Sequence, residues 1–129
     1  MQGVIKDFDM LKPVFGLLQR RLLGAFKYSI DGLSAAWKSE EAIKVELTIF
    51  PVLVFCALYF GPGKIEKILL IGSATLVIII ELLNTGLEKT IDRISSERHE
   101  LSKIVKDIGS AAVLLGLIQL IGVWLAIFL

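Results

Sequence analysis

The sequence predicts an all-α membrane protein, with three transmembrane helices preceded by an amphipathic surface helix. Of its 129 residues, 55% are hydrophobic, and the mean hydropathy of +0.76 is too high for an ordinary soluble domain of this size. Three apolar blocks are long enough, or nearly so, to cross a bilayer. A formal net charge of +1 provides no basic field, so no nucleic-acid partner is expected. We expect residues 1–129 to form a single membrane domain.

The surface helix is predicted over residues 10–36. Apolar side chains recur there at helical spacing between basic ones, at Val14, Leu17, Leu18, Leu22, Phe26, Ile30 and Leu33. This pattern is typical of a helix that lies in the cytoplasmic interface of a membrane. A helix packed on a soluble partner protein is the alternative.

The transmembrane helices are predicted at about residues 43–60, 68–87 and 108–129. The first contains Pro51, which a membrane helix tolerates when its neighbours satisfy the freed carbonyl. The sequence GPGK at residues 61–64 predicts a tight turn after it. The last block has no charged residue, and its Ala112 and Gly116 have the small-residue spacing that allows helices to approach closely.

The distribution of lysine and arginine predicts the orientation in the membrane. Seven lie in residues 1–44 and five in the second loop, residues 88–107, whereas the first turn holds only Lys64 and Lys67. Because cytoplasmic loops carry the excess of basic residues, the N-terminus and the second loop are expected in the cytoplasm.

Polar residues of the second span fall on one stripe of the helix. At 100° per residue, Glu81, Asn84, Glu88 and Asp92 lie within an arc of about 80°. The stripe should run from hydrocarbon at Glu81 to water at Asp92. A carboxylate at such depth costs roughly 2.5–3.5 kcal/mol on insertion scales, so it indicates a functional site. A Glu81 that only hydrogen-bonds a neighbouring helix is the structural alternative.

Phosphoryl transfer to a membrane-embedded hydroxyl suits this arrangement, because it needs a base, carboxylates for Mg²⁺ and cations for phosphates. Desolvation favours the protonated form of Glu81, as suits a general base. Glu88 is accessible to metal and nucleotide, and Glu40 and Glu41 can complete a metal site. Further charges come from Arg20, Arg21, Lys106 and Asp107. No P-loop or Rossmann motif is present, so side chains would hold the nucleotide. Taken alone, the charged loop also fits a plain solvated connector.

Two segments carry a family resemblance. They are ELLNTGLEKTIDRISSERHELSKIVKDIGSAAVLL, residues 81–115, and YSIDGLSAAWKSEEAIKVE, residues 28–46. Both closely resemble the small bacterial integral-membrane diacylglycerol kinases, and the similarity runs from Arg21 to about Leu115. The resemblance implies a homotrimer in the bacterial cytoplasmic (inner) membrane, with active sites shared between subunits. It also implies transfer of the γ-phosphate of MgATP to diacylglycerol, which gives phosphatidic acid.

The resemblance also implies roles for individual residues. Glu81 would be the catalytic base, supported by Asn84, and Glu40 and Glu88 would coordinate Mg²⁺. The residues expected to bind ATP are Arg21, Tyr28, Glu40, Glu88, Glu97, Arg98, His99, Lys106 and Asp107. Those expected to bind the lipid are Arg21, Ser29, Trp37, Glu46, Glu81 and Ser110.

The sequence departs from the family pattern at a few positions. Ile30, Asp31 and Ser34 stand where the family has a Trp, a Lys and an Arg, which bears on lipid preference. Arg98 replaces an aromatic residue in the loop that would receive adenine, which bears on nucleotide selectivity.

Two other functions remain open from the sequence. Related small kinases phosphorylate undecaprenol, a long polyprenyl alcohol, although the SAAW and SSERHELS segments favour the diacylglycerol branch. A small oligomeric proton-coupled transporter could use Glu81 as a protonation switch. Such a carrier has no need for a metal site beside a nucleotide site.

Overall fold

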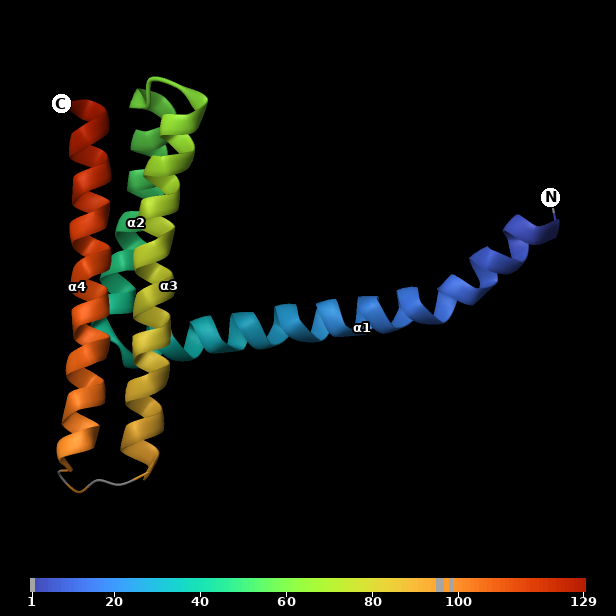
Figure 1. The fold of residues 1–129 in the computed structure, drawn as a ribbon, viewed down its shortest axis with the longest axis horizontal. Coiled ribbons are helices and arrows are strands. Elements are labelled where there is room, and N and C mark those ends of the chain that lie inside the picture. Colours follow the sequence, from blue (N-terminus) through green and yellow to red (C-terminus); the bar gives the residue numbers. More distant parts are fainter. Residues whose placement is uncertain (1, 95–96, 98) are drawn as a thin grey trace. The chain divides into compact units, whose positions relative to one another are not determined.

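The computed structural model describes residues 2–94, 97 and 99–129, and side chains from Phe15 onward within that part. Its four helices are α1 (Gln2–Ser39), α2 (Glu41–Phe60), α3 (Lys64–Ile94) and α4 (Glu100–Phe128) (Figure 1). With 20, 31 and 29 residues, α2, α3 and α4 are long and apolar enough to cross a membrane. The prediction of a helical protein with three long apolar helices is therefore confirmed.

The chain divides into two compact units, Met1–Ala35 and Ala36–Leu129. The first unit is made of most of α1, which includes the predicted surface helix. Large apolar side chains such as Leu22 and Phe26 are exposed on it, as are the basic Arg20, Arg21 and Lys27. A helix with both kinds of exposed side chain suits a membrane surface, and this location of α1 stays a prediction.

Within the second unit, α3 packs against both α2 and α4 (Figure 1). Its buried side chains recur every three or four residues, as one face of a helix requires. They are Leu70, Ser73, Ala74, Val77, Glu81, Asn84 and Thr85. The same face of α3 therefore carries the apolar core toward one end and the polar stripe toward the other.

Two glycines allow α4 to approach α3 closely. Gly109 and Gly116 are the residues of α4 that are buried. A Cβ on Gly116 would lie 3.0 Å from Cδ1 of Ile80, and a Cβ on Gly109 would overlap Oδ1 of Asn84. Ala112 is exposed. Gly109 therefore shares the α3-facing side of α4 with Gly116, and a role of the Ala112–Gly116 spacing in contacts with other subunits stays a prediction.

The breaks between helices fall at Glu40 and Gly61. Glu40 has extended backbone, with φ −121° and ψ 124°, and its N–H donates to the carbonyl of Ala36 at 2.9 Å. The N–H of Gly61 donates to the carbonyl of Ala57 at 3.0 Å, and a Cβ on Gly61 would collide with that oxygen. Gly61 is thus required by close approach of backbone at the predicted tight turn.

Much of the connection between the second and third predicted spans is helical. Residues 88–107 are predicted as loop, whereas α3 continues to Ile94 and α4 already begins at Glu100. The helices extend beyond the predicted spans because hydropathy marks where hydrocarbon ends, whereas helical hydrogen bonding continues into polar sequence. His99 caps α4, since its Nδ1 accepts a hydrogen bond from the N–H of Leu101 at 3.2 Å.

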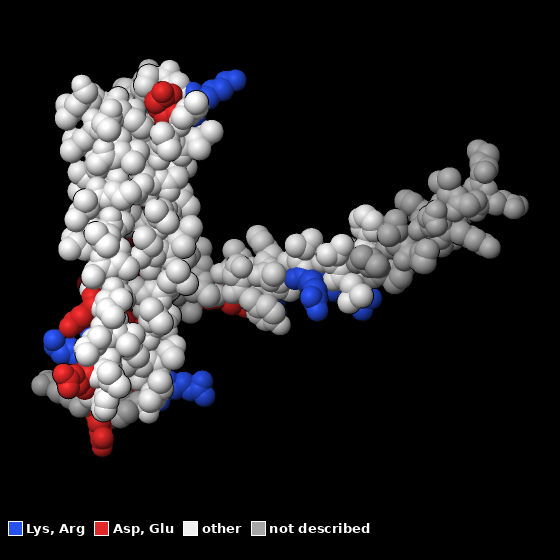
Figure 2. Space-filling model, in the orientation of Figure 1, with Lys and Arg blue, Asp and Glu red and all other residues white. Residues whose placement is uncertain are grey.

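Charged side chains gather toward the two ends of the three-helix unit, most of them at the end where α3 meets α4 (Figure 2). Between these ends, large apolar side chains such as Phe55 on α2 and Leu115 on α4 are exposed. An exposed apolar band of this kind suits contact with lipid tails or with apolar faces of other subunits.

Candidate active site

Exposure rises step by step along the stripe on α3. The side chains of Glu81 and Asn84 are 8% and 9% exposed, Glu88 is half-buried and Asp92 is exposed. The stripe thus leads from the packed interior to the charged end of the unit, as the helical spacing predicts. It offers a path along which a buried group and a water-soluble group can meet.

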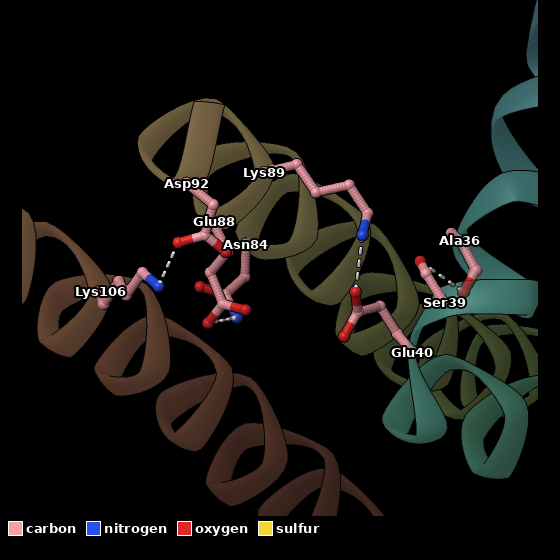
Figure 3. A network of polar contacts seen from close by, with 8 residues as sticks. All are labelled: Ala36, Ser39, Glu40, Asn84, Glu88, Lys89, Asp92 and Lys106. Carbon is pink, nitrogen blue, oxygen red and sulfur yellow. Dashed lines mark hydrogen bonds and ion pairs between the residues drawn. The ribbon is translucent and has the colours of Figure 1, made fainter. Parts of the chain in front are cut away.

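Asn84 lies in the middle of the stripe and contacts Glu88 on its own helix and Gly109 on α4. Its Nδ2 donates to Oε1 of Glu88 at 3.4 Å (Figure 3). Its Oδ1 lies against Gly109 of α4 and is buried without a hydrogen-bond partner among the described residues. A buried acceptor without a donor is costly, so this oxygen is suited to receive a hydrogen bond from a bound hydroxyl group.

On the α2 side of the stripe, two further carboxylates approach it. Oε1 of Glu40 lies 2.9 Å from Nζ of Lys89 (Figure 3). This hydrogen bond from the Lys89 ammonium lowers the pKa of Glu40 below its usual range. Glu46 is half-buried on α2, and its Oε2 has no hydrogen-bond partner among the described residues. The carboxyl groups of Glu46 and Glu81 lie close enough to interact electrostatically.

On the α4 side, Nζ of Lys106 lies 2.6 Å from Oδ1 of Asp92 (Figure 3). Lys103 and Asp107 form an exposed pair at 3.0 Å, one turn apart on the same helix. Of the predicted ATP-binding residues, Lys106 is therefore brought to the stripe, whereas Asp107 is paired along α4.

The carboxylates of Glu40, Glu81 and Glu88 provide oxygen ligands of the kind that Mg²⁺ prefers. Glu88 and Glu40 each lie close enough to Glu81 to interact with it electrostatically. Groups of three or more His, Cys, Asp or Glu side chains arranged to hold a metal are absent from the part of the chain that the structure describes. Mg²⁺ is usually held by one or two carboxylates, together with phosphate oxygens and water. Glu40 and Glu88 therefore suit a metal that arrives with a nucleotide.

Several other predicted residues lie outside the stripe. Arg21, Tyr28 and Ser29 are exposed on α1 within the unit of residues 1–35. Their predicted roles stay predictions, as do those of Glu41, Glu97, His99, Trp37 and Ser110. The prediction for Arg98 lies outside the described residues.

Sequence reasoning missed two residues that contact the site, Lys89 and Gly109. Lys89 follows Glu88 directly, but nothing in the sequence pairs it with Glu40, which lies 49 positions away. Gly109 occurs in the family-like segment KDIGSAA, and only its packing against Asn84 shows why a small residue is needed there.

Comparison with known proteins gives a consistent result. A family described as prokaryotic diacylglycerol kinase matches residues 27–128, a range that excludes Arg21. A protein of Haemophilus influenzae named diacylglycerol kinase is 44% identical over 103 residues, which cover 80% of this chain and 87% of that protein. Proteins of the same name from Escherichia coli K12 and Pseudomonas aeruginosa are 43% and 39% identical over 104 and 110 residues. These alignments cover 81% and 85% of this chain, and 85% and 89% of the two relatives. The chain belongs to the prokaryotic diacylglycerol kinase family.

Proposed function

We propose that the protein transfers the γ-phosphoryl group of ATP to the free hydroxyl of diacylglycerol, in the cytoplasmic membrane of a bacterium. The products are phosphatidic acid and ADP. The observation that carries this proposal is the stripe on α3, on which exposure rises from Glu81 to Asp92. The names of the relatives support a lipid kinase and diacylglycerol as its acceptor.

The chemistry assigns one task to each end of the stripe. The lipid hydroxyl oxygen attacks the γ-phosphorus, and the bond between that phosphorus and the β–γ bridging oxygen breaks, so that ADP leaves. The hydroxyl proton passes to the carboxylate of Glu81. The unpaired Oδ1 of Asn84 accepts a hydrogen bond from the hydroxyl before transfer and so orients it.

The charged end of the stripe receives the nucleotide. Glu40 and Glu88 would hold Mg²⁺, which when bound neutralises the negative charge that the phosphates bring. Lys106 adds a positive charge at the same end, beside Asp92. We assign nucleotide contacts to Arg21, Tyr28, Glu97, Arg98, His99 and Asp107 as well, and lipid contacts to Ser29, Trp37, Glu46 and Ser110.

The proposal includes a homotrimer whose subunits share active sites, with the N-terminus and the α3–α4 connection in the cytoplasm. The exposed apolar faces of α2 and α4 allow subunits to pack in the membrane. Twelve of the 14 lysine and arginine residues lie in the segments assigned to the cytoplasm, which supports this orientation.

The direct test is a phosphoryl-transfer assay on the purified protein. The full chain in mixed micelles receives ATP labelled in the γ-phosphate, Mg²⁺ and either diacylglycerol or undecaprenol. We expect labelled phosphatidic acid. Label found only in undecaprenol would show that undecaprenol is the acceptor and that the phosphoryl-transfer chemistry is as proposed. If the folded protein labels neither lipid, the kinase proposal is contradicted and a proton-coupled transporter becomes the favoured function.

Glu88→Gln should weaken magnesium-dependent ATP binding. The amide keeps the size of the side chain and can still accept the hydrogen bond from Asn84, but it loses the charge that attracts a metal ion. We expect the Kd for ATP in Mg²⁺ to rise by about tenfold, which corresponds to about 1.4 kcal/mol. Equilibrium dialysis with labelled ATP, with and without chelator, measures this change. Glu66→Gln, at the other end of α3, is the matched control and should bind as the wild type does.

A further inference from the structure

Lys89 lies beside the acidic stripe without being part of it. It follows Glu88 in the chain, and because successive helical residues differ by 100° around the axis, its side chain leaves the stripe. Figure 3 shows it directed toward the start of α2, whereas Asp92 points to the other side of α3, toward Lys106. Lys89 thus forms the ion pair that links α3 to Glu40.

The backbone of Glu40 is held locally, whereas its carboxylate interacts chiefly with Lys89 and more weakly with the side chain of Ser39. Its N–H donates to the carbonyl of Ala36 at 2.9 Å, and its own carbonyl accepts from the N–H of Lys44 at 3.4 Å. Although Glu40 is the residue that precedes α2, its carboxylate forms no capping hydrogen bond with that helix among the described residues. Lys89 is therefore the contact that joins this carboxylate to α3, in addition to the weaker contact with Ser39.

Lys89 also balances charge at a site rich in carboxylates. Its ammonium lowers the pKa of Glu40, whereas the negative charge of Asp92 acts on Glu40 in the opposite direction. The charge of Glu40 acts in turn on Glu81. Without Lys89, the negative charges of this cluster would repel one another with less compensation.

We infer that Lys89 is a positioning residue whose ammonium is the resident counter-ion of Glu40, and that a divalent cation displaces this ammonium when it binds Glu40. The inference rests on the proposed function, in which Glu40 is a metal ligand. An ammonium at 2.9 Å and a metal ion compete for the same carboxylate oxygens, and the two cations repel each other. Lys89 therefore keeps Glu40 beside the stripe in the absence of metal and lowers the affinity for free divalent cations.

The test is a titration of the full chain with Mn²⁺ in detergent, without nucleotide or lipid, in which electron paramagnetic resonance measures the free ion. Lys89→Met keeps an apolar stem of similar length and removes the charge. We expect it to bind Mn²⁺ about three- to fivefold more tightly than the wild type, the range of a partly exposed ion pair. Lys89→Arg keeps a cation and should bind as the wild type does. Because salt screens exposed charges, the gain should shrink in high salt.

Two further variants determine whether the effect is specific. Arg93→Met removes a positive charge one turn beyond Lys89 on the same side of α3, and it should leave the Kd for Mn²⁺ unchanged. Glu40→Gln added to Lys89→Met should abolish the gain, because the gain depends on that carboxylate. Circular dichroism confirms that each variant keeps its helix content.

The inference is overturned if Lys89→Met binds Mn²⁺ no better than the wild type, or if neither protein binds it measurably. It is also overturned if Arg93→Met gives the same gain, which would indicate a general field effect. Lipid labelling by the wild type is measured separately. Successful labelling with no gain in Mn²⁺ binding would reject only this inference, whereas a gain without labelling would reject only the proposed kinase activity.

Discussion

Glu81→Gln should reduce turnover by about 10²- to 10⁴-fold, the range that a general base contributes. The substitution keeps the size of a side chain that is 8% exposed, so the packing of α3 is preserved. The amide cannot accept the hydroxyl proton, and transfer to the lipid should therefore nearly stop. The measurement is kcat with labelled ATP and diacylglycerol at saturating concentrations of both.

Binding of MgATP by the same variant should be nearly unchanged, because the nucleotide is assigned to the other end of the stripe. This separation of turnover from binding distinguishes a base from a general loss of structure. Glu66→Gln at the far end of α3 is again the matched control. Wild-type turnover by Glu81→Gln would show that another group takes the proton.

Gly109→Ala should lower turnover by about 10- to 100-fold while the helices remain intact. The new Cβ would come too close to Oδ1 of Asn84, so the amide would have to rotate away. Rotation would break the 3.4 Å hydrogen bond to Glu88 and move the oxygen that is proposed to orient the lipid hydroxyl. A misplacement of about 1 Å at a reacting group can reduce the rate about 100-fold. Steady-state kinetics with varied diacylglycerol measures the loss.

A glycine elsewhere on α4 provides the control for Gly109→Ala. A Cβ on Gly122 would meet no atom within 4 Å, so Gly122→Ala makes the same chemical change in the same helix without a collision. It should keep wild-type turnover, and circular dichroism should show that both variants keep their helix content. Full activity in Gly109→Ala would mean that the position of the Asn84 amide does not limit the reaction.

Much of the fold follows from patterns that act over short distances in the chain. Apolar blocks of membrane length predict the three long helices, and GPGK predicts the break after α2. The spacing of Glu81, Asn84, Glu88 and Asp92 predicts that one face of α3 carries them, because a helix repeats every 3.6 residues. The ends of α3 and α4 are less predictable, since both helices continue into charged sequence.

Contacts across helices cannot be obtained in the same way. Lys103 and Asp107 lie one turn apart, a spacing at which pairing is expected. The pair Lys89–Glu40 joins α3 to the residue before α2, and the pair Lys106–Asp92 joins α4 to α3. The formation of both depends on how α2 and α4 are rotated against α3. That rotation is set by packing, including the approach of Gly109 to Asn84, which no local pattern encodes.

The length of α3 determines how a lipid substrate would reach the proposed site. At 1.5 Å per residue, its 31 residues extend about 46 Å, more than the roughly 30 Å of bilayer hydrocarbon. In the proposed orientation, α3 therefore places Glu81 at the level of the glycerol backbone of diacylglycerol. Both acyl chains of the substrate can then stay in the hydrocarbon of the membrane. Pulling those chains into water would cost about 0.8 kcal/mol per methylene, or more than 20 kcal/mol for some 30 methylenes. Sideways diffusion within one leaflet avoids that barrier.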